Sequence, residues 1–204
     1  MRIKLLILLS CFSFSGFSQS LDLKVYESIH VNRNPSLDGT MHGISVTAYP
    51  LTLAVPLGQF LYSIAKHDEK SIENAAQSVG AIIIAAAFTY GVKYTVQRDR
   101  PYITHPQYIP YEYDTSPSMP SGHTSMAFAT ATSLSLEYKK WYVVVPSFLY
   151  AGAVAYCRIH LGQHYPSDVL VGAVIGAGSS FASYKAMQWF KKKWTQKSEQ
   201  KFIE

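Results

Sequence analysis

The sequence predicts an all-α protein, a membrane-embedded helical bundle of about five spans, or six if an N-terminal leader is retained. Hydrophobic residues make up 48% of its 204 residues and charged residues only 15%, which is too little charge for a disordered chain or a coiled coil. The charges are confined to short segments between long charge-free stretches. Since about 17–25 apolar residues cross a bilayer, these stretches are the expected spans of a single domain.

Residues 1–18 are expected to be a signal peptide. Two positively charged residues precede an apolar core, and Gly16-Phe17-Ser18 supplies the small residues of a cleavage site. A lipoprotein motif that ends at Cys11 is the alternative, but it would leave a very short apolar core. Without cleavage the segment becomes the sixth span. In each case we expect the chain beyond Ser18 to start outside the cytoplasm.

Five later stretches are expected to cross the membrane within a domain of residues 19–190. Three are long enough for this, and two are marginal. In chain order they are Gly43–Ala65, Asn74–Val92, Ser121–Leu136, Trp141–Cys157 and Val169–Phe190, of which only the last holds a charge, Lys185. That lysine lies near the end of its stretch, where a long side chain can reach the membrane surface. The third stretch is rich in Ser and Thr, so it fits either a span or a buried helix of a soluble all-α domain, which is the rival interpretation.

The charges between these stretches predict the orientation of the chain. If the chain starts outside and crosses five times, the inside segments are 66–73, 137–140 and a basic cytoplasmic tail, 191–204. They carry most of the lysines, as the positive-inside tendency requires. A basic tail after an apolar run favours a contact with membrane lipids rather than with nucleic acid. We expect membrane lipids as partners, with no nucleic acid and no obligate protein partner.

Three polar clusters fall on the side of the membrane that this topology places outside, in the loops or at the ends of spans. They are Lys93 with Arg100-Pro101, then Pro120-Ser121-Gly122-His123, then Arg158 with His164 and Asp168. Such a set favours phosphoryl transfer, because Arg and Lys bind phosphate oxygens and a helix that starts near Ser121 offers free N–H groups. One imidazole can attack phosphorus while the other protonates the leaving oxygen. Carboxylates are too few to suggest a metal, so none is expected.

The spacing of these clusters resembles the three-part signature of the type 2 phosphatidic acid phosphatase (PAP2) superfamily. In this sequence the signature is Lys93-x6-Arg100-Pro101, Pro120-Ser121-Gly122-His123 and Arg158-x5-His164-x3-Asp168. The family includes membrane lipid phosphatases, soluble acid phosphatases and vanadium haloperoxidases, and the charge-free stretches are similar to the lipid phosphatase branch. Cys157 departs from the Ser or Ala that usually precedes the arginine.

The resemblance implies a PAP2/haloperoxidase-like core and a role for each matched residue. His164 would be the nucleophile that forms a phosphohistidine, Asp168 would orient it, and His123 would be the acid for the leaving group. The phosphate would be bound by Lys93, Arg100, Ser121, Gly122 and Arg158, without a cofactor. His160, His105, Tyr111 and Asp99 lie near these motifs, but match none of their positions and are expected to be packing or rim residues.

The implied activity is metal-independent hydrolysis of a lipid phosphate at the extracytoplasmic face of the cell (inner) membrane. Phosphatidic acid, phosphatidylglycerophosphate, undecaprenyl diphosphate and lipid A phosphates all fit this class, and the sequence does not choose among them. A soluble-type acid phosphatase or a vanadium haloperoxidase would use the same residues. A non-catalytic lipid binder or transporter is the weakest alternative, since both histidines are present.

Overall fold

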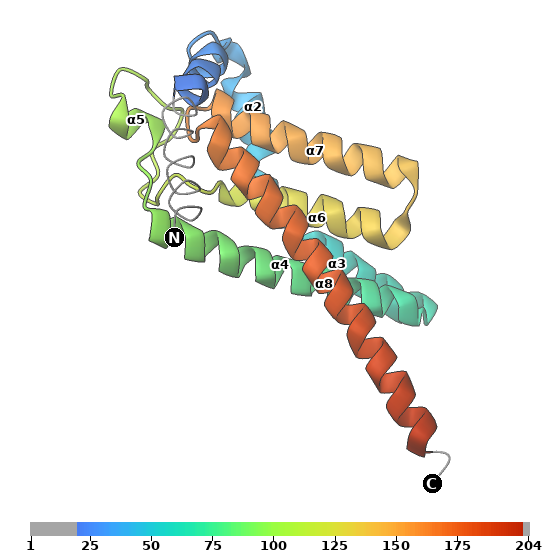
Figure 1. The fold of residues 1–204 in the computed structure, drawn as a ribbon. Coiled ribbons are helices and arrows are strands. Elements are labelled where there is room, and N and C mark those ends of the chain that lie inside the picture. The colour runs from blue at the N-terminus through green and yellow to red at the C-terminus, as the bar shows by residue number, and fades with distance from the viewer. Residues whose placement is uncertain (1–19, 202–204) are drawn as a thin grey trace, which may run out of the picture.

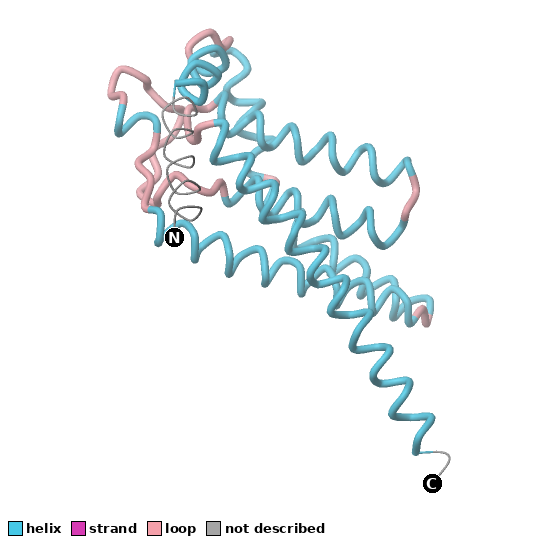
Figure 2. Tube along the Cα trace, viewed as in Figure 1, coloured by secondary structure: helices cyan, strands magenta, loops and turns pink. Residues whose placement is uncertain are grey.

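The computed structural model describes residues 20–201, which form helices joined by turns and loops, with no strand in that range (Figures 1 and 2). The all-α prediction is therefore confirmed. The elements are the helical residues 20–30, then η1 Pro35–Leu37, α2 Asp38–Val46, α3 Ala48–Lys66, α4 Glu69–Val96, α5 Pro101–Thr104, α6 Gly122–Tyr138, α7 Trp141–His160 and α8 Pro166–Lys201. The expected leader and Cys11 lie outside the described residues.

Each of the five charge-free stretches overlaps one of the five long helices, α3, α4, α6, α7 and α8, but the number of spans stays a prediction. Within the described residues, four helical segments are long and apolar enough to cross a membrane: Pro35–Lys66, Glu69–Thr104, Trp141–His160 and Pro166–Lys193. The fifth long helix, α6, has 17 residues. It packs against α3, α4, α7 and α8, which gives it a central place in the bundle.

Helix boundaries follow local chemistry. The side chain of Asp68 accepts a hydrogen bond from the Lys70 N–H and caps α4. Pro166 opens α8, where its missing N–H costs nothing. The first charge-free stretch is not one helix, because a turn at Thr47 separates α2 from α3. The segment from Tyr102 to Pro120 is irregular beyond the short α5.

Close packing of α8 on α6 depends on two glycines one helical turn apart. A Cβ atom at Gly172 would lie 2.7 Å from the Ser121 carbonyl oxygen, and one at Gly176 would overlap the Ser125 carbonyl oxygen. Small residues of this kind let two helix backbones approach each other. The first turn of α8 therefore lies beside the start of α6, and the Ser121 N–H donates to the Asp168 carbonyl oxygen at 3.0 Å.

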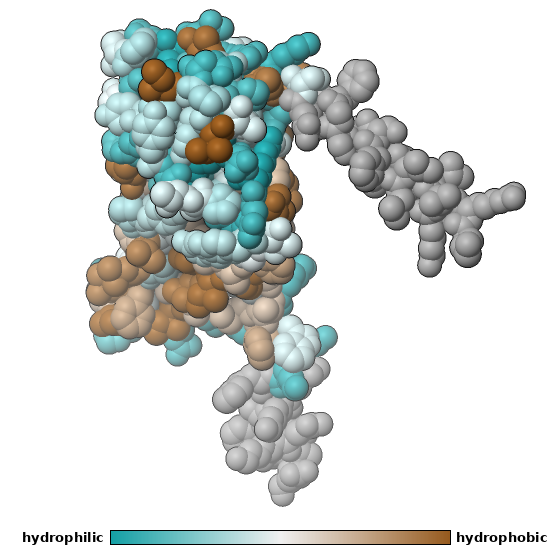
Figure 3. All heavy atoms as spheres, turned by 90° about the vertical axis from the view of Figure 1, so that its left-hand side faces the viewer, coloured by the Kyte–Doolittle hydropathy of each residue, from teal (hydrophilic) through white to brown (hydrophobic). Residues whose placement is uncertain are grey.

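The surface divides into a polar end and an apolar part (Figure 3). Loops and short helices gather at the end where α7 finishes and α8 begins (Figure 2). Large apolar side chains are exposed along α3, α4, α7 and α8, among them Leu53, Ile83, Leu149 and Val174. Exposed apolar surface of this extent marks contact with a membrane or a partner rather than with water.

Candidate active site

The three polar clusters of the sequence meet at the polar end of the bundle. Lys93 lies in the last turn of α4, Arg158 near the end of α7, and Asp168 in the first turn of α8. A cavity of about 390 Å³ brings most of the predicted site residues together. It is lined by Lys93, Arg100, Gly122, His123, Arg158 and His164, with Tyr49, Thr89, Tyr90, Tyr94, Asp114, Ser116 and Met126.

Gln163 aligns the two arginines of the cavity. Its side-chain oxygen accepts from Arg100 Nη1 at 3.0 Å and from Arg158 Nη2 at 3.5 Å. Arg158 is also bound to the Ser45 hydroxyl at 3.0 Å, while its buried Nε–H has no partner within residues 20–201. Lys93 donates to the Pro117 carbonyl oxygen. Two guanidinium groups held by an amide, with donors of Arg158 left unpaired, have the charge and geometry suited to binding an anion.

One acidic residue already lies among these cations. Asp114 lines the cavity and accepts from Arg100 Nη2 at 2.7 Å. Partial burial by itself would raise the pKa of Asp114, but the Ser116 N–H and the Arg100 guanidinium together lower it. The side chain is therefore a carboxylate at neutral pH, and it occupies a donor that a phosphate would need.

His164 is buried and held in its neutral form. Only 2% of its surface is exposed, and this burial lowers its pKa to about 3, with Arg100 and Arg158 acting in the same direction and Asp168 in the opposite one. A neutral imidazole has a free lone pair on one ring nitrogen, which attack on phosphorus requires.

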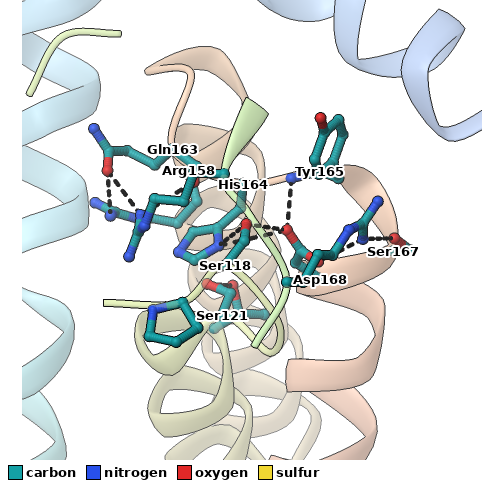
Figure 4. A network of polar contacts seen from close by, with 12 residues as sticks. Ser118, Ser121, Arg158, Gln163, His164, Tyr165, Ser167 and Asp168 are labelled. Atoms are coloured by element: carbon teal, nitrogen blue, oxygen red, sulfur yellow. Dashed lines mark hydrogen bonds and ion pairs between the residues drawn. The ribbon is translucent and has the colours of Figure 1, made fainter. Parts of the chain in front are cut away.

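The contact of His164 with Asp168 differs from the expected one. Their nearest atoms, Nδ1 and Oδ2, are 3.7 Å apart, which is too far for a direct hydrogen bond. The Ser118 hydroxyl lies between them (Figure 4), donating to Asp168 Oδ2 at 2.5 Å and lying 3.4 Å from His164 Nδ1. Ser118 is fully buried, and the sequence motifs did not indicate it.

Gly122 and Ser121 hold different places at the start of α6. A Cβ atom at Gly122 would lie 2.7 Å from the Tyr49 hydroxyl oxygen, so a larger residue would push this wall of the cavity outward. Ser121 is the N-cap residue, as expected, but its side chain makes no capping bond. Its buried hydroxyl accepts from Thr124 instead, and Ser121 is not among the residues that line the cavity.

Several contact residues were missed because they carry no motif of their own. Arg98, which contacts Asp168, and Ser118 and Gln163 each lie one or two positions from a motif residue. Asp22, which contacts Arg98, lies far away in the sequence. The sequence offers one indirect signal of these residues: Asp168 was expected at the site, and a buried carboxylate needs hydrogen-bond partners. Within residues 20–201, no group of three or more His, Cys, Asp or Glu side chains is placed to hold a metal ion.

The sequence that carries these residues matches a known family. The family model of the PAP2 superfamily matches residues 74–192, more than half of the chain. The chain belongs to the PAP2 superfamily. This confirms the family that the motifs indicated, and with it the class of enzyme, a phosphatase of the PAP2 type in a multi-pass membrane protein.

Relatives of this PAP2 chain include solved and curated proteins. The crystal structure of LpxE from Aquifex aeolicus is 29% identical and superposes with a TM-score of 0.67 over 81% of this chain and 95% of that chain. An undecaprenyl-diphosphatase from Sulfolobus acidocaldarius is 26% identical over 163 residues, 79% of this chain and 76% of that protein. A lipid A 1-phosphatase from Porphyromonas gingivalis is 45% identical over 62 residues, 29% of this chain but 14% of that protein.

Proposed function

We propose that this PAP2 protein hydrolyses a lipid phosphate or diphosphate through a phosphohistidine on His164, at the extracytoplasmic face of the inner membrane. The observation that carries the proposal is the cavity that Lys93, Arg100 and Arg158 line together with His123 and His164. Three cations beside two imidazoles fit the charge and the proton transfers of a phosphoryl group.

The position of the cavity supports a substrate with an apolar tail. Three of its lining residues, Tyr49 on α3 and Tyr90 and Tyr94 on α4, are also exposed on the outer surface of the bundle. Tyrosine is favoured where a membrane meets water, and the helices that carry these residues have apolar outer faces. A phosphate head group can therefore enter from the side while its tail stays in the bilayer.

The two histidines divide the first chemical step. Because His164 Nδ1 faces Ser118 and Asp168, the opposite nitrogen, Nε2, faces away from them and is the one to attack phosphorus. A bond forms from Nε2 to phosphorus as the phosphorus–oxygen bond to the leaving group breaks. His123, which enters this step protonated beside the bound phosphate, gives its proton to that oxygen and becomes neutral, and the three cations hold the charge on the other oxygens. In the second step His123 takes a proton from water, which attacks phosphorus and frees His164.

The proposed orientation rests on the loops around the site. The cavity lies at the end that carries segments 20–42, 93–120 and 158–168, whereas the basic residues that follow Phe190 continue α8 away from it. Lysine-rich ends stay in the cytoplasm, so the cavity would open outside. The PAP2 relatives named as an undecaprenyl-diphosphatase and a lipid A phosphatase support lipid diphosphate or lipid A phosphate as the substrate class.

Phosphate release from a panel of lipids tests the proposal. Purified protein in mixed micelles would be given phosphatidic acid, phosphatidylglycerophosphate, undecaprenyl diphosphate and lipid A, with p-nitrophenyl phosphate as a soluble comparison. We expect at least one lipid to be cleaved with far higher kcat/KM than the soluble ester, no effect of EDTA, and inhibition by vanadate, which resembles five-coordinate phosphorus. Equal efficiency on lipid and soluble esters would point to a general acid phosphatase instead.

A further inference from the structure

Asp168 is held by more groups than the catalytic signature accounts for. Its side chain is fully buried. Oδ1 accepts from Arg98 Nη1 at 2.6 Å, and Oδ2 accepts from the Ser118 hydroxyl at 2.5 Å and from the Tyr165 N–H at 2.9 Å. His164 is farther from this carboxylate than any of these three groups. The position of Asp168 is therefore set chiefly by residues other than the histidine that it serves.

Arg98 joins this carboxylate to a second one at the N-terminal end of the described chain. Its Nη2 donates to Asp22 Oδ2 at 2.7 Å, and its guanidinium carbon lies 4.1 Å from the centre of the Tyr165 ring. Asp22 also accepts from the Ser167 N–H at 2.8 Å and from the Ser167 hydroxyl at 2.5 Å. Arg98 thus lies between two buried carboxylates, a geometry that the planar fork of arginine allows and a lysine ammonium does not reproduce.

Ser118 is the only one of these partners that also reaches His164. A hydroxyl has one donor and two acceptor sites, so Ser118 can donate to Asp168 while it accepts from the His164 Nδ1–H (Figure 4). Arg98 holds this serine through its backbone as well, because the Arg98 carbonyl oxygen accepts from the Ser118 N–H at 2.7 Å. Arg98 therefore fixes both the carboxylate and the backbone that carries the bridging hydroxyl.

We propose that Arg98, anchored by Asp22, is a positioning residue that holds Asp168 and Ser118 in a hydroxyl-bridged contact with His164. The inference rests on the proposed function, since it assigns His164 as the nucleophile. No proton leaves the bridge: Ser118 keeps its hydrogen toward Asp168, and His164 keeps its Nδ1 hydrogen toward Ser118. The bridge fixes the tautomer, so that the lone pair of His164 is on Nε2 when phosphorus arrives.

A double-mutant cycle separates this role from a merely structural one. Arg98→Gln should lower kcat roughly 10–100-fold, the usual effect of removing a group that orients a reactive residue, with little change in KM. In an Asp168→Asn background the same substitution should have almost no further effect, because both changes disable one unit. If the fold-loss of kcat in the double variant equals the product of the losses in the two single variants, the proposal is overturned.

Arg33 provides a matched control. Its ion pair with Asp38 joins side chains of similar burial, 18% and 12% exposed against 24% and 7% for Arg98 and Asp22, and it touches none of the residues around Asp168. Arg33→Gln should leave kcat near the wild-type value even if it lowers the melting temperature. A loss of kcat equal to that of Arg98→Gln would mean that breaking any such pair suffices, and the proposal would fail.

Ring-nitrogen chemical shifts give a readout that does not need turnover. In protein labelled with ¹⁵N-histidine, the His164 signals, assigned with His164→Gln, should show one neutral tautomer in the wild type and a mixture in Ser118→Ala and in Arg98→Gln. If Arg98→Gln does not fold, Ser118→Ala and Asp22→Asn carry the test. An unchanged tautomer in the variants contradicts the bridge, whereas a wild type as inactive as His164→Ala on every lipid contradicts the proposed function alone.

Discussion

The two cavity histidines predict different dependences on the leaving group. His164→Ala should abolish turnover of every substrate, because nitrogen attack is common to all of them. His123→Ala should keep measurable activity on a substrate with a good leaving group, such as a p-nitrophenyl ester, and lose most activity on an alkyl phosphate. Steady-state rates on the two substrate types measure this, and Asp168→Asn should fall between the two alanine variants.

Phosphate trapping completes that comparison. Wild-type protein mixed with ³²P-labelled substrate and denatured at alkaline pH, where phosphohistidine survives, should carry label, and His164→Ala should carry none. Label on His164→Ala, or its normal turnover, would end the proposed mechanism.

The buried neutral His164 also predicts how stability depends on pH. Folding lowers its pKa from 6.5 to about 3, so below pH 6.5 the unfolded chain takes up a proton that the folded chain does not. The free energy of unfolding should therefore fall as the pH drops through this window, by at most about 1.4 kcal/mol per pH unit from this group. Thermal unfolding in detergent at pH 7 and pH 5 should show a smaller decrease for His164→Gln than for wild type. The control His67→Gln, at an exposed histidine, should lose as much thermal stability between pH 7 and pH 5 as the wild type does.

Residues with a motif could be predicted from the sequence, and residues defined only by contact could not. The cavity unites Lys93, Arg100 and Arg158 as the signature implies. The role of Arg98 depends on its ion pair with Asp22, 76 positions away. That pair forms only when the N-terminal helical residues pack on α8. Ser118 likewise could not be predicted, because its hydroxyl lies beside His164 and Asp168 only through the path of the loop before α6.

At the scale of elements, long helices were predictable because apolar runs must be buried or face lipid. The apolar stretches located the five long helices, although α8 begins at Pro166, three residues before the stretch expected from Val169. The helical residues 20–30 were missed, since the segment is polar enough to resemble a loop. The break at Thr47 was missed, although Pro50 in the first turn of α3 lacks the N–H that would continue the preceding helix and so marks a helix start.

The contact between α6 and α8 predicts a sharp difference between two glycines on one helix. Gly176→Ala should destabilise the protein by roughly 1–3 kcal/mol, as overpacking does, because the added methyl would meet the Ser125 carbonyl oxygen and lie 2.8 Å from the Ala129 nitrogen. Gly178→Ala meets nothing within 4 Å, so it should be neutral or slightly stabilising. Melting temperatures in detergent compare them, and equal effects would mean that α8 does not pack as described.

At the scale of the whole molecule, the proposed orientation predicts which ends of the bundle meet an impermeant reagent. With Cys11 and Cys157 replaced, a cysteine at Tyr113 in the loop should react with a membrane-impermeant maleimide in spheroplasts, where the outer face of the inner membrane is open. A cysteine at Lys192 should react only after lysis. Both side chains are exposed on the protein surface, so packing would not protect them. Labelling of the Lys192 position in intact spheroplasts would show that the orientation is opposite to the one proposed.

The Arg100–Asp114 pair bears on how the cavity empties. Because a carboxylate already rests on Arg100 at 2.7 Å, an arriving phosphate does not enter a vacant cationic site but exchanges with an anion that the chain supplies. The affinity for phosphate is then the attraction of the three cations for phosphate minus the attraction of Arg100 for the Asp114 carboxylate. In the proposed mechanism, inorganic phosphate would occupy this cavity after each cycle, and the Asp114 carboxylate would compete with it for Arg100. If the proposed site is correct, the loop that carries Asp114 would favour release of the product, a step that limits turnover in many enzymes.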